Sequence, residues 1–587
     1  MTSEKPIDPR TPDEAPAVAS AATSAPRSRR RATTITVVAA VAVATTAALV
    51  LALGPLAPRP NAPAPTAPPT ATPAPTSPET AYQRPADWSP YRPAVHLTPA
   101  ERWMNDPQRP FWLDGRWHYY YLFNADYPEG NGTEWYHATS TDLVHWRDEG
   151  VAIDKYENGL GDIETGSAVI DVENTAGFGA GAVIAVVTQQ HEGVQRQSLF
   201  VSTDGGFRFE PIDGNPVLDN PGVRDFRDPK IVWDEARRTW IMVLAEGSKL
   251  GFYTSSDLRD WTYRSGFDRD DLGLLETPDL FRISVDGDPA NTRWVLMAGA
   301  HGDLDRDGMS TGTAYWTGDW NGERFTADRD EPAWLDRGAD LYATVTWDDS
   351  RLAPAERLER RYAIGWLNNW AYAGDLPTED WQGGAASVVR EISLRTIDGV
   401  PTLTSAPIET LAELEGAPAR ATDVVVREAP DVSAAGTRAE TVSALPQPTS
   451  DAYRLRVELA ATEAERGEAR IRVKEGGGHF ATVGVDFATN RVFIARDADT
   501  AASAMPSVYR EVRWANVAPR DGVVTLDVIV DAASVEVFAN DGEAVLSSVM
   551  FPSPGANGLS AEAVGGDIRF RSFEISPLAV APVERLD

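Results

Sequence analysis

The middle of the chain repeats a strand–turn–strand unit, and this repeat limits the fold more than any other feature. Five apolar, strand-like runs begin 54 to 68 residues apart, at Arg116, Gly181, Arg238, Thr292 and Arg360. Four of them are followed by a turn and a second strand-like run, and two of these turns share the pattern Asp-Leu-x-x-Trp, at Asp142 and Asp257. Small antiparallel units at this period are typical of β-propeller blades. The repeat therefore predicts five blades.

The pattern of apolar and polar residues changes after about Ile408. Strands of alternating apolar and polar residues follow, separated by turn residues, and begin at Tyr453, Ala469, Val523 and Ser534. This pattern is typical of a β-sandwich. We therefore expect an all-β chain, with a five-bladed propeller over residues 91–408 and a C-terminal β-sandwich over residues 409–587. We expect the sandwich to cover the flank of the propeller rather than to bind carbohydrate independently.

Three segments precede the propeller. Residues 1–31 form a basic segment that ends in the run RSRRR, residues 32–54 are apolar, and residues 55–90 are rich in Pro, Ala and Thr. The apolar segment has about the length of a membrane span, roughly 20 residues. This order indicates an export segment with the basic residues on the cytoplasmic side. A cleaved signal peptide and a retained membrane anchor both fit, and either one places the propeller outside the cell, secreted or on the outer face of the membrane.

Charge and cysteine content exclude several classes of function. A net charge of −33 argues against nucleic acid or an anionic membrane surface as a partner, because phosphate binding needs clustered Lys and Arg. The absence of cysteine excludes thiolate catalysis, disulfides and Cys-ligated zinc. The stretch Asp303–Gly308 matches half of a calcium loop, but position twelve is Ala314, so a solvated acidic loop is the preferred interpretation. We expect no metal and no cofactor.

Three acidic residues stand beside prolines in separate repeat units: Asp106 in NDP, Asp228 in FRDPK and Glu276 in ETPDL. A propeller places loops from all blades around one end of a channel, so these side chains can meet there. Glycoside hydrolysis needs two carboxylates, one ionised and one protonated, and a third can raise the pKa of the acid. Taken alone, each of these acidic residues is explained equally well as a turn residue between strands. The three together indicate a glycosidase that is either retaining or inverting. They do not identify the sugar that it cleaves.

The motifs WMNDP, FRDP and ETPDL, with GWLNNW at Gly365 and SVEVFANDGEAVLSS at Ser534, resemble glycoside hydrolase family 32, the invertase, inulinase and levanase family. The resemblance runs from about Trp103 to Phe551. It implies a catalytic five-bladed propeller with a C-terminal sandwich, and cleavage of fructosyl linkages with retention. The roles that it implies are a nucleophile, Asp106, an acid/base, Glu276, and a transition-state stabiliser, Asp228. The implied substrate contacts are Asn105, Gln108, Thr165, Arg227 and Asp340.

The chain departs from the family motifs at four places. Gln108-Arg109-Pro110 follows Asp-Pro where the family has Asn-Gly, and Leu122 stands where a sugar-binding Gln is usual. Glu164-Thr165-Gly166-Ser167 replaces Phe-Ser-Gly-Ser, and Thr277 replaces the Cys beside the acid. These changes weigh against sucrose. They resemble the branch of levanases, levanbiohydrolases and levan fructotransferases, so the expected partner is levan, a β-2,6-linked fructan, with fructose or levanbiose as the product.

Several alternatives stay open on the sequence alone. Water as the acceptor gives a hydrolase, whereas an internal hydroxyl gives a cyclic difructose anhydride, the product of a levan fructotransferase. An inulinase or an invertase is a further alternative. A fructan-binding protein without catalysis is disfavoured because all three carboxylates are present. The sequence does not define endo or exo cleavage, product size or oligomeric state.

Overall fold

The computed structural model describes residues 88–302, 308–428, 445–462, 466–581 and 583–586. Within these ranges the regular structure consists of strands and four short 3-10 helices, η1 (Asp270–Leu272), η2 (Glu356–Leu358), η3 (Glu409–Leu414) and η4 (Ser507–Arg510). In this part of the chain no helix has the length and apolar character that a membrane span requires. The export segment at residues 32–54, the basic segment before it and the acidic stretch 303–307 lie outside the described residues.

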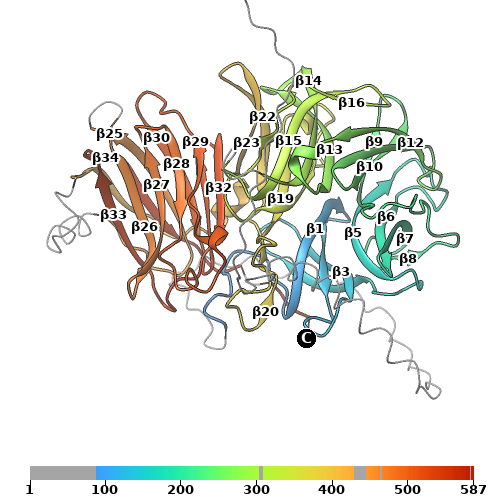
Figure 1. The fold of residues 1–587 in the computed structure, drawn as a ribbon, viewed down its shortest axis with the longest axis horizontal. Coiled ribbons are helices and arrows are strands. Elements are labelled where there is room, and N and C mark those ends of the chain that lie inside the picture. Colours follow the sequence, from blue (N-terminus) through green and yellow to red (C-terminus); the bar gives the residue numbers. More distant parts are fainter. Residues whose placement is uncertain (1–87, 303–307, 429–444, 463–465, 582, 587) are drawn as a thin grey trace, which may run out of the picture. The chain divides into compact units, whose positions relative to one another are not determined.

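Five antiparallel blades form the propeller (Figure 1). Blade one contains β1 (Arg102–Leu113), β2 (Arg116–Asn124), β3 (Thr133–Ser140) and β4 (Arg147–Ile153). Blade two contains β5 (Asp162–Asp171), β6 (Ala182–His191), β7 (Val194–Ser202) and β8 (Glu210–Pro211). Blade three contains β9 (Arg227–Asp234), β10 (Thr239–Glu246), β11 (Lys249–Ser255) and β12 (Thr262–Asp268).

The last two blades are bridged into one sheet by a pairing between β13 and β22. Blade four contains β13 (Glu276–Val285), β14 (Asp288–His301), β15 (Thr311–Trp320) and β16 (Phe325–Ala327). Blade five contains β18 (Tyr342–Trp347), β19 (Arg361–Leu367), β22 (Arg390–Ile397) and β23 (Val400–Pro407). Three short strands pair with β15, β1 and β19 respectively: β17 (Ala333–Trp334), β20 (Trp381–Gln382) and β21 (Ala385–Ala386).

The five apolar runs predicted from the repeat form the second strand of each blade: β2, β6, β10, β14 and β19. These strands have neighbours on both sides, and most of their central residues are buried on both faces. Burial on both faces explains why each run reads as continuously apolar rather than alternating. The Asp-Leu-x-x-Trp turns connect the third and fourth strands of blades one and three, where the carboxylates of Asp142 and Asp257 accept backbone N–H bonds at 2.8–2.9 Å.

The first strands of the blades form a closed ring. β1 contacts β5, β5 contacts β9, β9 contacts β13, β13 contacts β18, and β18 contacts β1. The ring therefore brings residues near the starts of these five strands together at one end of a central channel. Blade one is completed by a distant segment, because β20 pairs in parallel with β1 at Arg102 and Trp381. Just before β1, the carbonyl of Leu97 accepts the N–H of Ala386.

Two sheets enclose the core of the C-terminal sandwich, drawn in orange and red in Figure 1. The six-stranded sheet has the order β24 (Ala419–Val426), β34 (Ile568–Pro577), β25 (Tyr453–Ala461), β30 (Val524–Val530), β31 (Ser534–Ala539) and β32 (Ala544–Val549). The five-stranded sheet has the order β29 (Arg513–Asn516), β28 (Arg491–Ala495), β27 (His479–Asp486), β26 (Glu468–Gly476) and β33 (Gly558–Val564). The four alternating segments noted in the sequence are β25, β26, β30 and β31.

Candidate active site

Asp106 lies in a bulge of β1, where the register with β2 shifts between Met104 and Pro107. Proline has no N–H to donate to a strand ladder, so it favours such a break, and a bulge turns the neighbouring side chain to a new direction. The carboxylate that results is partly exposed and held on both oxygens. Thr165 Oγ1 donates to Oδ2 at 2.6 Å, and Asn105 Nδ2 donates to Oδ1 at 3.3 Å. The NDP motif thus produces a fixed, accessible carboxylate.

Gln108 supports this arrangement from behind. Its Nε2 donates to the carbonyl of Asp106 at 3.0 Å, and its Oε1 accepts the N–H of Gly166 at 2.9 Å. Gly166 ends a matching bulge in β5 that begins at Ile163 and presents Thr165. Gln108 is fully buried, with no exposed surface. We expected Gln108 to contact substrate; in this structure its amide joins the two bulges instead.

Asp228, near the start of β9, has a left-handed backbone with φ 63°. Side chains such as Asp tolerate this conformation at a cost, and such residues are concentrated at functional sites. The N–H of Asp228 donates to Thr188 Oγ1 at 2.9 Å, and its Oδ2 accepts the N–H of Thr277 at 2.8 Å. These two bonds define the position of the buried carboxylate from blades two and four.

Glu276 is the first residue of β13, and both of its carboxylate oxygens have partners. Arg227 donates to Oε1 at 2.9 Å and also bonds Asp225 at 2.6 Å. Tyr342, the first residue of β18, donates its hydroxyl to Oε2 at 2.9 Å. Each of the five blades therefore supplies one group to the cluster, because Asp106, Thr165, Asp228, Glu276 and Tyr342 come from β1, β5, β9, β13 and β18.

Asp340 lies elsewhere, contrary to our expectation of a sugar contact. Its side chain is fully buried and forms an ion pair with Arg496. It also accepts the hydroxyl of Tyr372 and, at 2.9 Å, the N–H of Val549. Arg496 and Val549 belong to the sandwich domain, so this carboxylate joins the two domains. The residue that reaches the cluster is Tyr342, two positions further along the chain.

A flat aromatic surface borders the nucleophile position. Trp370 is 48% exposed and stacks on Trp103 with ring centroids 6.2 Å apart. The indole Nε1 of Trp103 donates to Asn105 Oδ1 at 3.2 Å, which connects this surface to the bulge that carries Asp106. Exposed rings of this kind suit the apolar faces of sugars. In the sequence, Trp370 is the last residue of the GWLNNW motif, and that position was its only sequence signal.

The carboxylates of the cluster are electrostatically coupled. Burial raises the pKa of Asp106 to about 6, and the charge of Glu276 adds to this while the bond from Thr165 opposes it. Burial also raises the pKa of Asp228 to about 7, with Arg227 opposing and Asp106 adding. Burial and neighbouring negative charge therefore make both Asp106 and Asp228 harder to ionise than an exposed Asp. Among the described residues, no group of His, Asp and Glu has the arrangement of a metal site.

The family assignment rests on the two halves of the chain. Residues 96–407 match the model "Glycosyl hydrolases family 32 N-terminal domain", and residues 420–577 match "Glycosyl hydrolases family 32 C terminal". The chain belongs to glycosyl hydrolase family 32. This confirms the resemblance drawn from the motifs, and the two matched segments of the family 32 chain coincide with its propeller and its sandwich.

Individual relatives agree with this assignment. The family 32 chain is 43% identical over 491 residues to a levanbiose-producing levanase of Bacillus subtilis (strain 168). The aligned residues cover 83% of this chain and 90% of that protein. It is 46% identical over 383 residues to a levanbiose-producing levanase of Geobacillus stearothermophilus, with coverage of 65% and 92%. The solved structure of exo-inulinase from Aspergillus awamori superposes with a TM-score of 0.72 at 27% identity, covering 84% of this chain and 99% of that chain.

Proposed function

We propose that this family 32 chain degrades levan, cleaving β-2,6-fructosyl linkages with retention and releasing fructose or levanbiose. The observation that carries the proposal is the cluster in which Asp106, Asp228 and Glu276 converge from three blades. The choice of levan is supported by two relatives that match 83% and 65% of this chain, and both are named levanbiose-producing levanases. The departures from the family motifs at Gln108 and Leu122 point in the same direction.

In the first step, Asp106 attacks the anomeric carbon of the fructosyl unit while Glu276 gives its proton to the leaving oxygen. A covalent fructosyl-enzyme and a shortened chain result. The bonds from Thr165 and Asn105 orient the attacking carboxylate before substrate arrives, which reduces the entropic cost of attack. After it has lost its proton, Glu276 is stabilised by the Arg227 guanidinium and the Tyr342 hydroxyl.

Asp228 stabilises the transition state, in which positive charge develops on the sugar ring. Its carboxylate is positioned by the N–H of Thr277 and accepts hydroxyl groups of the fructosyl unit in this proposal. In the second step, Glu276 removes a proton from water, and the resulting hydroxide displaces Asp106 from the anomeric carbon. Two displacements at the same carbon restore its original configuration, which gives net retention.

The place of action follows from the N-terminal segments. Basic, apolar and Pro-rich stretches in that order support export, with residues 32–54 as a signal peptide or a retained anchor. We therefore place the catalytic propeller outside the cytoplasm, where a polysaccharide substrate is accessible.

The substrate assignment is tested by incubating the purified full chain separately with levan, inulin and sucrose, and identifying products by chromatography and mass. We expect fructose or levanbiose from levan, and much slower turnover of the other two. A product one water lighter than a disaccharide would identify intramolecular transfer instead of hydrolysis. Faster turnover of inulin or sucrose would contradict the levan assignment, and no turnover of any of the three would contradict the enzyme itself.

The pH dependence tests the role of Asp106. The nucleophile must be ionised, so kcat/KM on levan should fall as the pH decreases through about 6, the raised pKa of Asp106. The Thr165 hydroxyl lowers that pKa by bonding the carboxylate. Thr165→Val should therefore move the acid limb to higher pH, by about half to one unit. Thr165→Ser keeps a hydroxyl and should retain the original profile; an equal shift in both variants would refute the link.

A further inference from the structure

Glu164 is a further carboxyl group at the candidate active site, and the proposed mechanism does not use it. It lies in the bulge of β5, where Glu164 and Thr165 together stand opposite a single residue of β6, Thr188. Thr165 bonds Asp106 at 2.6 Å, and Thr188 Oγ1 accepts the N–H of Asp228 at 2.9 Å. The bulge therefore places Glu164 between the nucleophile and the residue that stabilises the transition state.

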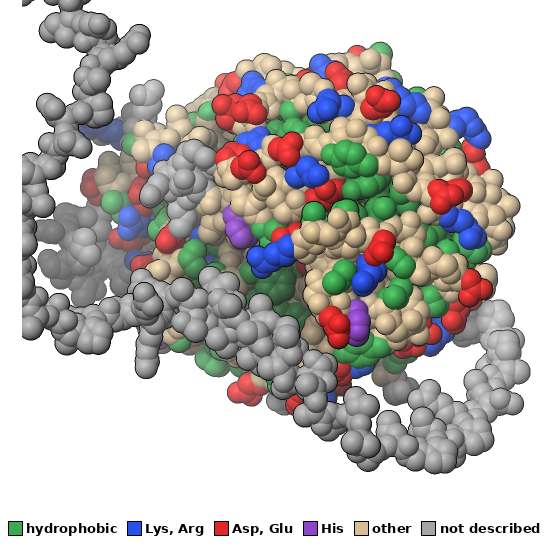
Figure 2. Space-filling model, turned by 45° about the vertical axis from the view of Figure 1, so that its right-hand side comes forward, with side chains coloured by type: hydrophobic (Ala, Val, Ile, Leu, Met, Phe, Trp, Pro, Cys, Tyr) green, Lys and Arg blue, Asp and Glu red, His purple; other side chains and the backbone are tan. Residues whose placement is uncertain are grey.

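The backbone of Glu164 is held in place, whereas its carboxyl group is free. Trp135 Nε1 donates to the carbonyl oxygen of Glu164 at 3.0 Å. The side chain is half-buried, and among the described residues neither carboxyl oxygen has a hydrogen-bond or ion-pair partner. Each oxygen keeps some contact with solvent. Many acidic side chains on the surface lie beside basic ones, as the intermingled red and blue groups in Figure 2 show. Glu164 has no such partner, so its full bonding capacity is available to a ligand.

The surroundings of Glu164 disfavour its ionised form. Burial raises the pKa of Glu164 to about 8. The negative charges of Asp162, Asp228 and Asp106 add to this shift. The guanidinium of Arg227 opposes it, but two other carboxylates already bond that group. At neutral pH the side chain is therefore mainly a carboxylic acid, with one O–H to donate and a carbonyl oxygen to accept.

A structural role does not account for this side chain. A carboxyl group whose pKa is higher in the folded chain than in the unfolded chain opposes folding at neutral pH. The carboxyl of Glu164 returns nothing within the folded chain, because it bonds no described residue. Groups of this kind, with a shifted pKa and a place in the active site, are concentrated among functional residues. Glu164 also stands at one of the four places where the chain departs from the family motifs.

We propose that Glu164 binds the fructan directly, with its carboxyl group bonded to hydroxyl groups of the fructosyl unit that Asp106 attacks. This inference rests on the proposed function, because it assigns a further contact to the same site. Sugar hydroxyls both donate and accept, which matches a carboxylic acid whose two capacities are unused. A phosphorylated sugar is disfavoured, because its negative charge would lie beside the carboxyl groups of the site.

The first test measures binding without turnover. Levantriose, the trisaccharide of levan, is titrated by calorimetry into full-length Asp106→Asn and into the same chain with Glu164→Leu or Glu164→Gln added. We expect Glu164→Leu to weaken binding by about five- to tenfold, because leucine bonds no hydroxyl. Glu164→Gln should bind within about twofold of Asp106→Asn alone, since its amide both donates and accepts. Undiminished binding by Glu164→Leu would overturn the proposal, as would an equal loss in both variants.

Two further readouts separate a substrate contact from a structural role. With Asp106 intact, Glu164→Leu should raise KM on levan by about five- to tenfold and change kcat by less than about threefold. Its melting temperature at pH 7 should equal or exceed that of the unaltered chain, because the substitution removes a carboxyl that opposes folding. A markedly lower melting temperature would show that the side chain supports the fold, and would overturn the proposal.

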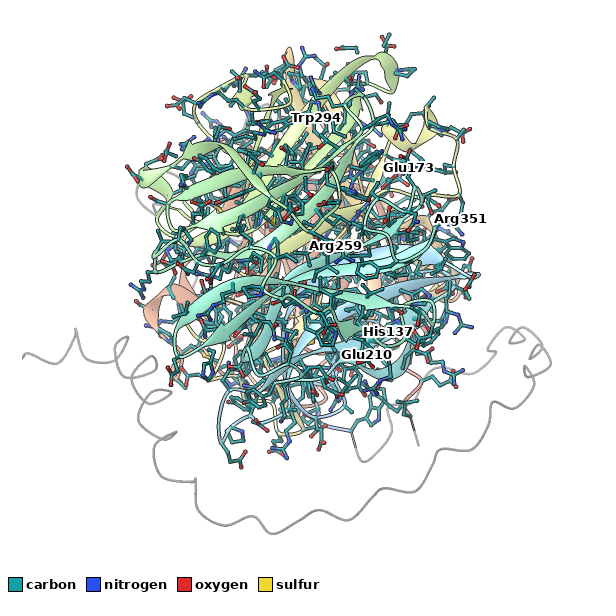
Figure 3. All side chains as sticks on the ribbon, turned by 90° about the vertical axis from the view of Figure 1, so that its right-hand side faces the viewer. His137, Glu173, Glu210, Arg259, Trp294 and Arg351 are labelled. Atoms are coloured by element: carbon teal, nitrogen blue, oxygen red, sulfur yellow. The ribbon has the colours of Figure 1, made fainter. Side chains whose placement is uncertain are left out.

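Glu157→Leu is the matched control. Glu157 is exposed and precedes the same strand. The charges that act on it come from Asp154, Arg208 and Glu210, none of which belongs to the catalytic cluster. Figure 3 labels Glu210, which lies on β8, the outer strand of blade two. Glu157→Leu should leave levantriose binding and KM unchanged, and a loss equal to that of Glu164→Leu would overturn the assignment.

Levan turnover by the unaltered chain separates this proposal from the proposed function. Normal turnover in the unaltered chain and in Glu164→Leu alike would overturn the contact at Glu164 alone. Absence of levan turnover in the unaltered chain would contradict the proposed function and the contact together.

Discussion

Asp106→Asn should lower kcat/KM on levan by about ten-thousandfold or more, while the protein melts at a higher temperature than the unaltered chain. Activity is lost because the amide cannot attack the anomeric carbon. Stability rises because burial raises the pKa of Asp106 above its value in an unfolded chain, so at neutral pH the ionised side chain opposes folding. Asparagine has the same shape, and its oxygen still accepts the bond from Thr165.

The measurement is a pair of initial-rate and thermal-melting experiments at pH 7. Asp114→Asn is the matched control, since Asp114 is an exposed acid directly after the same strand and should leave both values nearly unchanged. Activity of Asp106→Asn within tenfold of the unaltered chain would rule out Asp106 as the nucleophile. Loss of activity together with a lower melting temperature would mean that the carboxylate has a structural role as well.

Glu276→Gln should lower levan hydrolysis by about a hundredfold to ten-thousandfold, because a neutral amide neither protonates the leaving oxygen nor activates water. A substrate with a leaving group that needs no proton, such as fructosyl fluoride, should still react in the first step. The fructosyl-enzyme should then accumulate, since its hydrolysis also depends on Glu276. Mass spectrometry of the intact protein would detect one added fructosyl group.

This accumulation separates the two roles. The double variant Asp106→Asn, Glu276→Gln should carry no adduct, because the attacking carboxylate is absent. Full hydrolysis of fructosyl fluoride by Glu276→Gln without an adduct would place the acid/base function on another residue. Tyr342→Phe, which removes one bond to Glu276, should lower the rate less than Glu276→Gln and form no stable adduct.

The fold and the three carboxylates could be predicted because their signals are local. A central strand buried on both faces reads as one apolar run, and five such runs at a regular period define five blades. Asp106, Asp228 and Glu276 each stand next to or two positions before a proline. Their convergence then follows from the propeller, in which every blade begins at the same end of the ring.

The remaining site residues could not be assigned in this way. Bulges on both sides of Gln108 break the alternation of strand faces, so its burial cannot be counted from sequence. Asp340 precedes β18, and its partner Arg496 is 156 residues away in the other domain, which no local pattern indicates. Asp340 was expected to contact the sugar from the family resemblance alone, and Tyr342 was not considered. The structure shows that Tyr342 is the side chain of this segment that bonds Glu276.

The parallel pairing of β20 with β1 has a consequence for truncated forms of the chain. The edge of β1, the strand that carries Asp106, pairs with β20 at Trp381. The segment just before β1 is bonded to β21, because the carbonyl of Leu97 accepts the N–H of Ala386. A chain that ends after blade four already carries Asp106, Asp228 and Glu276. It lacks both the strand that borders β1 and the tyrosine that bonds Glu276. A chain truncated before the last blade should therefore carry all three carboxylates and still lack a complete site.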